Sequence, residues 1–328
     1  MKESFGRAVL YRIISSLLIL FFLISFLFVL LRISPGGPEQ KFISPQLKPE
    51  LIEKVRESFN LDKPITEQYS AFLLNSIRGN FGISYNYREP VFDVIMEYLP
   101  FTLIFALIVV IVQLLLSFWL SFISISRLNS RADRYISKFT LLLYSIPTFV
   151  AGVFLIYIFS EKLNVFPSSG LKSIQHSDMD SAARFWDYIE HLILPVITLC
   201  LGGIAVYYRY LRDNLEEIYT KPFILNLRAA GVNEKEITLR HVIPNAVNPL
   251  ITVTGIDLGL LLSGALITEV IFGLPGMGRL TVTAILTRDY PLVLGCTFTA
   301  GIFIIITNLA ADIVKARIDK RLIKGISG

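Results

Sequence analysis

Charged residues are scarce in this chain of 328 residues: they make up 17% of the sequence, whereas 53% of the residues are hydrophobic. An average soluble domain carries about 25% charge, so the composition predicts a polytopic membrane protein. The apolar composition and the absence of a Gly-X-Y repeat exclude disordered and fibrous classes. Cysteine is also rare. Cys200 and Cys296 both lie inside apolar runs, which excludes a disulfide scaffold and indicates two small buried side chains.

Motifs for nucleotide binding and hydrolysis are missing as well. The sequence contains no G-x-x-x-x-G-K-[ST] phosphate loop, no H-E-x-x-H zinc helix and no G-x-S-x-G nucleophile elbow. Its three histidines, His176, His191 and His241, fall in three separate segments outside the apolar runs. We therefore predict no catalytic residue, no metal site and no bound cofactor in this chain.

Six apolar runs are long enough to cross a bilayer, whose hydrocarbon core needs about 20 mostly apolar residues per helix. They are residues 13–31, 98–126, 139–160, 192–208, 242–268 and 290–311. Because the runs are continuous rather than alternating, they exclude a transmembrane β-barrel. The first run is longer than the apolar part of a secretion signal and lacks a cleavage site, so it is expected to stay as an anchor. The predicted fold class is all-α with six transmembrane helices.

Lysine and arginine are concentrated on one predicted side of the membrane. The N-terminus, residues 127–138, residues 209–241 and the C-terminal tail together hold 18 of them, against 5 in the two short loops of the other side. The positive-inside rule discounts the long loop after the first run. Both termini are therefore predicted to be cytoplasmic.

Two segments on the opposite side carry further patterns. In residues 32–97, apolar residues recur at helical spacing behind Pro49 and again after Pro64, which predicts two amphipathic helices. These helices would pack on each other or on the rim of the membrane domain, either as a cap or as a substrate contact. Residues 161–191 are predicted to form a solvated loop with one short helix around Trp186.

The loop between the fourth and fifth runs predicts two short helices separated by a break. Thr220 can cap a first helix that begins at residues 221–222, where proline is tolerated. Gly231 ends this helix, and Asn233 with Glu236 is close to a capping box that starts the next. One face of the first helix is apolar and is expected to contact a soluble partner: Phe223, Leu227 and Ala230.

Polar side chains inside the apolar runs are candidates for a translocation pathway. Asp257 interrupts the fifth run, Glu269 lies at its outer end, and Gln113 lies in the second run. Each side chain either lines the pathway, where an acid would meet a peptide amino group, or makes a structural hydrogen bond to a neighbouring helix. Pro147 and Pro195 predict kinks in the third and fourth helices.

The cytoplasmic loop also carries a family resemblance. Residues 228–231, followed by residues 239–246, resemble the EAA loop of type I ATP-binding-cassette importer permeases, in the form found in peptide and nickel systems. The chain departs from the motif at Leu225, where the family often has an acid. The long external segment is similar to that of B-type subunits of oligopeptide and dipeptide importers. Further matching segments are residues 32–38, 78–82, 99–103, 145–149, 166–170 and 269–280.

The resemblance implies an organisation and a set of partners. Residues 1–98 would form the first helix and the external region, residues 99–312 the permease domain, and residues 313–328 a cytoplasmic tail. The partners would be a homologous C-type permease, two ATPase subunits that bind ATP and Mg²⁺, and an external substrate-binding protein, in the lipid of a bacterial inner membrane and with no role for nucleic acid. The implied ATPase-docking residues are Phe223, Leu227, Arg228, Ala229, Ala230 and Gly231.

The resemblance leaves the cargo open among oligopeptides, dipeptides, nickel chelates and glutathione. An ion-coupled secondary transporter is the alternative, with Asp257 or Glu269 as a proton or sodium site near the midplane. Such a fold predicts an internal repeat of broken helices, and no convincing repeat is found between the two halves. An intramembrane hydrolase is disfavoured because the histidines lie outside the apolar runs.

Overall fold

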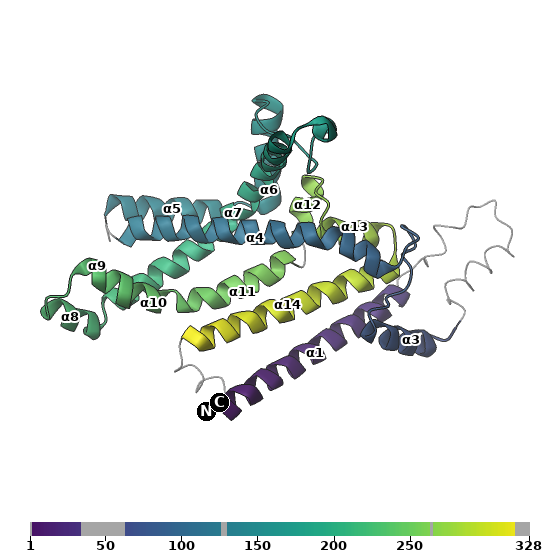
Figure 1. Ribbon diagram of the computed structural model, residues 1–328, viewed down its shortest axis with the longest axis horizontal. Helices are drawn as coiled ribbons and strands as arrows, with labels where there is room; N and C mark the ends of the chain where they lie inside the picture. The colour runs from purple at the N-terminus through teal and green to yellow at the C-terminus, as the bar shows by residue number, and fades with distance from the viewer. Residues whose placement is uncertain (1, 34–62, 126–129, 263–264, 319–328) are drawn as a thin grey trace.

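The computed structural model describes residues 2–33, 63–125, 130–262 and 265–318. Within these residues it contains α-helices with short 3-10 and π-helical segments and no β-strand, which confirms the all-α membrane fold. Five helical segments are long and apolar enough to cross a membrane. Figure 1 shows α1, α14, α11 and α4 running along one common direction. The spanning elements are α1 (Lys2–Ile33), α4 (Val91–Ile125), α7 (Ser181–Tyr219), α11 (Asn248–Leu262) with α12 (Leu266–Ile271), and α14 (Tyr290–Ile318).

The third predicted span is a broken helix rather than a kinked one. It consists of α5 (Arg131–Ser145) and α6 (Thr148–Leu155), which continues as a π-helix over Ile156–Lys162 and bends away from α5 by 94°. Proline lacks an amide donor and disfavours helical backbone in the residue before it, and the residue before Pro147 is extended here, with φ −84° and ψ 120°. At Pro195, by contrast, α7 continues without a break.

The fourth span begins earlier than its apolar run. The short helix expected around Trp186 is the start of α7, and Asp180 caps it by accepting a hydrogen bond from the Ala183 amide at 2.7 Å. Charged residues in these first turns end the apolar run but do not end the helix, so the prediction of a separate helix was wrong. A 3-10 helix, Ile174–Asp178, precedes α7. Helix α13 (Met277–Leu286) is a further helix, which the six apolar runs did not predict.

In the segment predicted to be external, one of the two predicted amphipathic helices is described. Helix α3 (Ile65–Ile77) begins directly after Pro64 as predicted and packs on α1. The Phe28 ring stacks on Phe72 with centroids 5.4 Å apart, and the Ser25 and Tyr69 hydroxyls lie 2.5 Å apart. The helix predicted behind Pro49 lies outside the described residues.

Three clusters of buried apolar side chains hold the bundle. One lies near α13 and contains Val91, a middle one contains Leu194, and a third contains Leu215 beneath the loop between α7 and α11. Cys296 belongs to the first cluster and Cys200 to the second, and both are free thiols. The prediction of two small buried side chains is therefore confirmed.

Candidate functional site

The basic segments that were predicted to share one side of the membrane gather at one end of the molecule. The start of α1, the end of α14, the start of α5 and the short helices between α7 and α11 all lie at the left of Figure 1. Helices α3 and α13 lie at the other end. This arrangement places the predicted docking helix on the same end as the surplus of Lys and Arg.

The predicted docking helix is α8, which spans Pro222–Ala229. Its proline occupies the first turn, where a missing amide donor costs no intrahelical hydrogen bond. The prediction of a Thr220 cap was wrong, because that hydroxyl donates to the Glu217 carbonyl at 2.8 Å and leaves the start of α8 without a side-chain cap.

A glycine turn ends α8 as predicted. Gly231 has φ +77°, its amide donates to the Arg228 carbonyl at 3.0 Å, and the Val232 amide donates to the Leu227 carbonyl at 3.1 Å. This pair of bonds is a Schellman motif, whose left-handed position favours glycine. The turn fixes the angle at which α8 leaves the chain.

The apolar residues of α8 divide between the protein and the solvent. Ile224 is fully buried and Leu227 is partly buried, and both belong to the cluster beneath the loop. Phe223 and Leu225 are 39% and 55% exposed. The prediction that Phe223 and Leu227 form the outward pair is therefore corrected: Leu227 holds α8 to the protein, and Leu225 shares the free face with Phe223.

The helix that follows is tied to α8 by an ion pair. Asn233 caps α9 (Glu234–Ile237) by accepting from the Lys235 amide at 2.9 Å, as predicted. Glu234 pairs with Arg228, which also lies over the Tyr219 ring at 5.9 Å. The hydrogen-bonded pair lowers the pKa of the Glu234 carboxyl and raises the pKa of Arg228.

Glu236 does not complete the predicted capping box, because its carboxylate pairs with Arg240 at 2.6 Å. From α9 the chain continues through the π-helix Thr238–Val242 and α10 (Ile243–Ala246) into α11. The Tyr219 hydroxyl at the end of α7 lies 2.6 Å from the Thr238 hydroxyl. A movement of α8 is thereby linked to the ends of both α7 and α11.

A buried polar network between α4, α5 and α7 was not predicted. The Asp133 carboxylate accepts two hydrogen bonds from Arg212 at 3.0 Å each and a third from Ser124. The Tyr208 hydroxyl lies 2.8 Å from Ser124 and 2.9 Å from Ser137. A lone acid in the otherwise basic segment 127–138 was the available signal.

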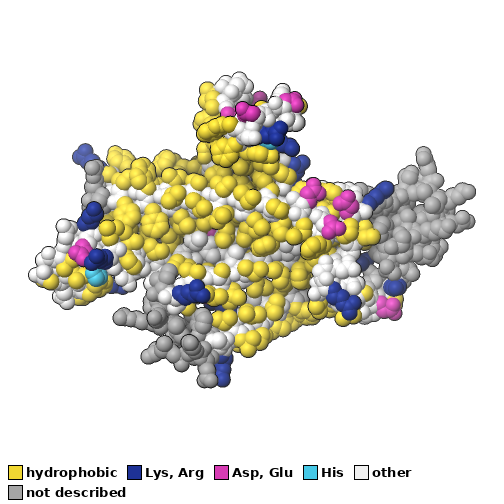
Figure 2. Space-filling view, viewed as in Figure 1, with side chains coloured by type: hydrophobic (Ala, Val, Ile, Leu, Met, Phe, Trp, Pro, Cys, Tyr) yellow, Lys and Arg dark blue, Asp and Glu magenta, His cyan; other side chains and the backbone are white. Residues whose placement is uncertain are grey.

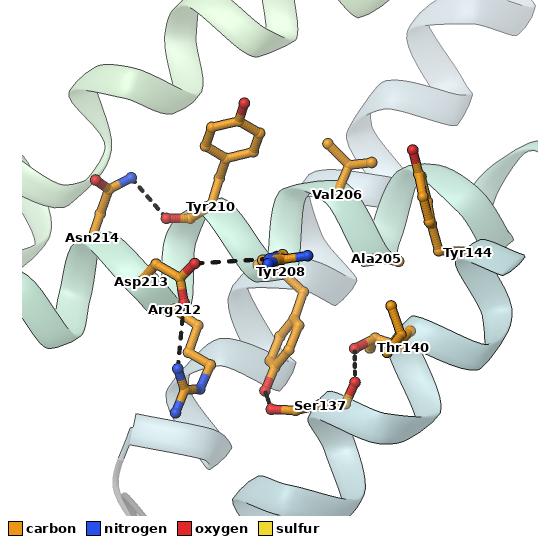
Figure 3. Close-up of a pocket in the computed structure, with 12 residues that line it drawn as sticks. Ser137, Thr140, Tyr144, Ala205, Val206, Tyr208, Tyr210, Arg212, Asp213 and Asn214 are labelled. Carbon is orange, nitrogen blue, oxygen red and sulfur yellow. Dashed lines mark hydrogen bonds and ion pairs between the residues drawn. The ribbon is translucent and has the colours of Figure 1, made fainter.

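This network borders a cavity of about 800 Å³ between α5 and α7. Figure 3 shows Tyr208 pointing from α7 to Ser137 on α5 and Arg212 pointing to the same side, whereas Tyr210 points away from them. The lining mixes hydroxyl, amide and charged groups with the apolar side chains of Leu141 and Val206. The cavity is of a size that holds a small ligand.

Two of the three pathway candidates, Gln113 and Asp257, make hydrogen bonds to α7. Gln113 is buried, and its amide donates to the Leu199 carbonyl at 3.2 Å, beside Gly203. Asp257 is half-buried on α11 and accepts a hydrogen bond from the Tyr207 hydroxyl at 2.9 Å. The partial exposure of Asp257 leaves it able to face a pathway, whereas Gln113 is closed in by α7.

Glu269 is fully buried and does not face any open surface of the structure. Its carboxylate accepts from the Arg279 amide at 2.9 Å and from the Thr102 hydroxyl at 3.4 Å. A Cβ on Gly276 would lie 2.4 Å from the same carboxylate. Glu269 therefore holds the start of α13 against α4, which is the structural one of the two roles predicted for it.

Comparison with known proteins identifies the class. The sequence profile described as "Binding-protein-dependent transport system inner membrane component" matches residues 113–324, and the N-terminal profile of the same transport systems matches residues 6–106. The chain belongs to this family. It is a multi-pass membrane protein and the B-type permease subunit of an ATP-binding-cassette importer.

Named relatives cover nearly the whole chain. A putative peptide permease of Brucella suis biovar 1 is 33% identical over 96% of this chain and 98% of its own length. The oligopeptide transport system permease AppB of Bacillus subtilis is 31% identical over 90% and 92%, and the nickel import system permease NikB of Staphylococcus aureus strain MRSA252 is 29% identical over 96% and 91%. The inward-facing MetNI methionine transporter resembles the fold, with a TM-score of 0.52 at 17% identity, over 69% of this chain and 96% of that one.

Proposed function

We propose that the chain forms half of a translocation pathway for peptides or a related small cargo, with α8 and both termini in the cytoplasm. The observation that carries the proposal is α8 itself, a short helix fixed to the bundle on one face and apolar on its free face. The peptide permeases among its relatives support peptide cargo. The cavity between α5 and α7 and the partly exposed Asp257 are the candidate pathway surfaces.

The energy for transport would come from a pair of separate ATPase subunits that bind ATP and Mg²⁺. Phe223 and Leu225 would fill a groove on one of them, and burial of each side chain contributes about 1.5–3 kcal/mol. When ATP binding brings the ATPases together, α8 moves with its ATPase. Because Ile224 and Leu227 anchor α8 to the buried cluster, the displacement passes to α7 and α11 and opens the bundle alternately to each side.

The remaining partners would be a homologous C-type permease, which completes the pathway, and an external binding protein that delivers cargo. Lipid would surround the membrane-spanning helices, and this chain would bind no cofactor of its own. The surfaces that this chain forms together with those partners would determine which cargo is transported: peptides, nickel chelates or glutathione.

Co-expression with ATPases of the same operon tests the docking proposal. Leu225→Asp places a charge in the docking face and is expected to weaken the affinity for the ATPase by two or more orders of magnitude, since each factor of ten corresponds to about 1.4 kcal/mol. The loss is measured as reduced co-purification of the ATPase. Leu286→Asp on α13, at an exposed leucine of the opposite end, is the matched control. Normal ATPase recovery and uptake in the Leu225 variant would contradict the assignment of α8.

The same preparation separates the importer from an ion-coupled transporter. Proteoliposomes that contain this chain alone are expected neither to hydrolyse ATP nor to accumulate cargo. Uptake by the chain alone that collapses with the ion gradient would favour the ion-coupled alternative.

A further inference from the structure

Helix α5 exposes a line of cations near its start. Arg131, Arg134 and Lys138 are all exposed, and they recur at i, i+3 and i+7, so they lie along one face of the helix. The inward face of the same turns is buried and contains Asp133 and Thr140. We call the three cations the basic stripe. Because the stripe lies on the outward side of α5, all three charges are accessible to a ligand.

The basic stripe has no ion pair with an acid among the described residues. Two arginines near the start of a helix are also unfavourable, because the helix dipole places positive partial charge there. The acid of the first turn, Asp133, is bonded to Arg212 on the inward side instead. Other cations in the segments at this end of the molecule each pair with an acid: Arg12, Arg209, Arg212, Lys221, Arg228 and Arg240.

A second line of exposed side chains borders the basic stripe. Tyr135, Phe139 and Leu142 recur at i, i+4 and i+7, and we call them the apolar stripe. After Lys138 the sequence contains no charged residue before Glu161. Figure 2 shows basic side chains at this end of α5 beside a continuous apolar surface. The outward surface of α5 therefore changes from charged to apolar within about one helical turn.

A phosphate that carries an acyl chain matches both stripes. Lysine and arginine side chains at the boundary between water and hydrocarbon attract the phosphates of anionic lipids, and the neighbouring aromatic and aliphatic side chains contact acyl chains. A small soluble anion would pair with the cations but leave the apolar stripe in water. A zwitterionic lipid brings its own cation with its phosphate, so it would leave the charge of the basic stripe unbalanced.

We propose that the outward surface of α5 is a binding site for an anionic phospholipid, with its phosphate at the basic stripe and an acyl chain along the apolar stripe. The site is separate from the cavity between α5 and α7, which α5 lines with Ser137 and Thr140 among others. Because Asp133 joins the same turns of α5 to Arg212 on α7, a lipid held here stabilises the contact between these helices. The site does not depend on the proposed function.

Lipid titration of the purified full-length chain tests the proposal. The chain in detergent receives phosphatidylglycerol or phosphatidylcholine with the same acyl chains, and native mass spectrometry counts the bound lipid. We expect tighter binding of phosphatidylglycerol. Replacing the basic stripe in one variant, Arg131→Gln with Arg134→Gln and Lys138→Gln, should weaken this binding on the order of a hundredfold, since each cation contributes roughly a factor of five. Arg131→Lys with Arg134→Lys keeps the charge and should retain the binding.

A matched control removes three exposed cations from other segments at the same end: Arg7→Gln, Lys235→Gln and Arg317→Gln. This variant loses the same net charge and should bind phosphatidylglycerol as the unmodified chain does. A second measurement needs no variant. A photoactivatable phosphatidylglycerol, added to membranes that contain the chain with co-expressed ATPases, should label peptides from residues 131–145.

Several results would overturn the proposal. An equal loss of binding in the control variant would show that the lipid responds to the net charge of this end and not to α5. Displacement of the lipid by glycerol 1-phosphate would make the ligand a soluble phosphate. Loss of ATPase co-purification in the glutamine variant, with normal co-purification in the control, would make the basic stripe a protein contact. Labelling confined to other helices would place the lipid elsewhere.

Discussion

The two ends of the molecule each hold a short helix against the spans, but in different ways. At one end, α8 is held by apolar side chains on one face and keeps its other face free. At the other end, α13 is held by the Glu269 carboxylate, and its first two residues, Met277 and Gly278, are buried. Apolar contacts tolerate sliding, whereas a buried carboxylate between amides tolerates little displacement. The comparison indicates a mobile coupling element at one end and a fixed joint at the other.

The fixed joint is expected to give the largest effect on stability. In Glu269→Ala, the Arg279 amide and the Thr102 hydroxyl lose their buried acceptor, and each such group costs about 1–3 kcal/mol. We expect a marked fall in thermal stability in detergent and in the yield of inserted protein. Glu97→Ala, at an exposed glutamate on α4, is the matched control. Retention of normal stability by the Glu269 variant would show that α13 does not depend on this carboxylate.

The two leucines of α8 are expected to separate anchoring from docking. Leu227→Asp puts a charge into the cluster beneath the loop and is expected to destabilise the packing of α8 on this cluster by roughly 2 kcal/mol or more. Helix α8 should then become accessible to protease. Leu225→Asp leaves the anchor in place, so α8 stays protected while ATPase binding is lost. Limited proteolysis with ATPase co-purification distinguishes them. Identical behaviour of the two variants would refute the division of α8 into two faces.

Gly231→Val tests the turn that aims α8. An added side chain meets no atom within 4 Å, but a β-branched residue at φ +77° costs about 1–2 kcal/mol. We expect ATPase to remain bound while hydrolysis uncouples from uptake, because α8 is misaimed. Gly202→Val on α7 is the control, since that glycine also has open space but no positive φ. Coupled uptake at the normal rate in the Gly231 variant would contradict this role.

The sequence predicted features that depend on neighbouring residues better than those that depend on distant ones. Apolar runs located the spans, and the glycine and asparagine at either end of the α8–α9 turn were interpreted correctly from local chemistry. The outward face of α8 was not, because Leu225 and Leu227 are both apolar and only the position of the cluster decides which of them is covered.

The role of Glu269 could not be predicted for a similar reason. Its partners Thr102 and Arg279 come from another span and from a helix beyond a turn, so no local pattern distinguishes a structural carboxylate from a pathway acid. The Asp133 and Arg212 pair likewise joins α5 to α7, two helices whose paired residues are far apart in sequence. The 94° break was half predictable: Pro147 indicated a kink, but the size of the bend depends on the packing of α6 against α7 and α12.

The smallest expected effect is a pH dependence of the end of the molecule that carries α8. Because Arg228 lowers the pKa of Glu234, their pair stabilises the α8–α9 turn fully above the unfolded glutamate pKa of about 4.3 and is lost as pH falls through the lower folded value. Hydrogen exchange of the α8 amides, corrected for the intrinsic rate, should therefore stay constant from neutral to mildly acidic pH and accelerate slightly below it, and less so in high salt, which screens the pair. Glu234→Gln should remove this step. Glu217→Gln, which breaks the similarly exposed pair between Glu217 on α7 and Lys221 at the start of α8, should leave the step unchanged. A step that survives in the Glu234 variant would mean that another group controls the turn.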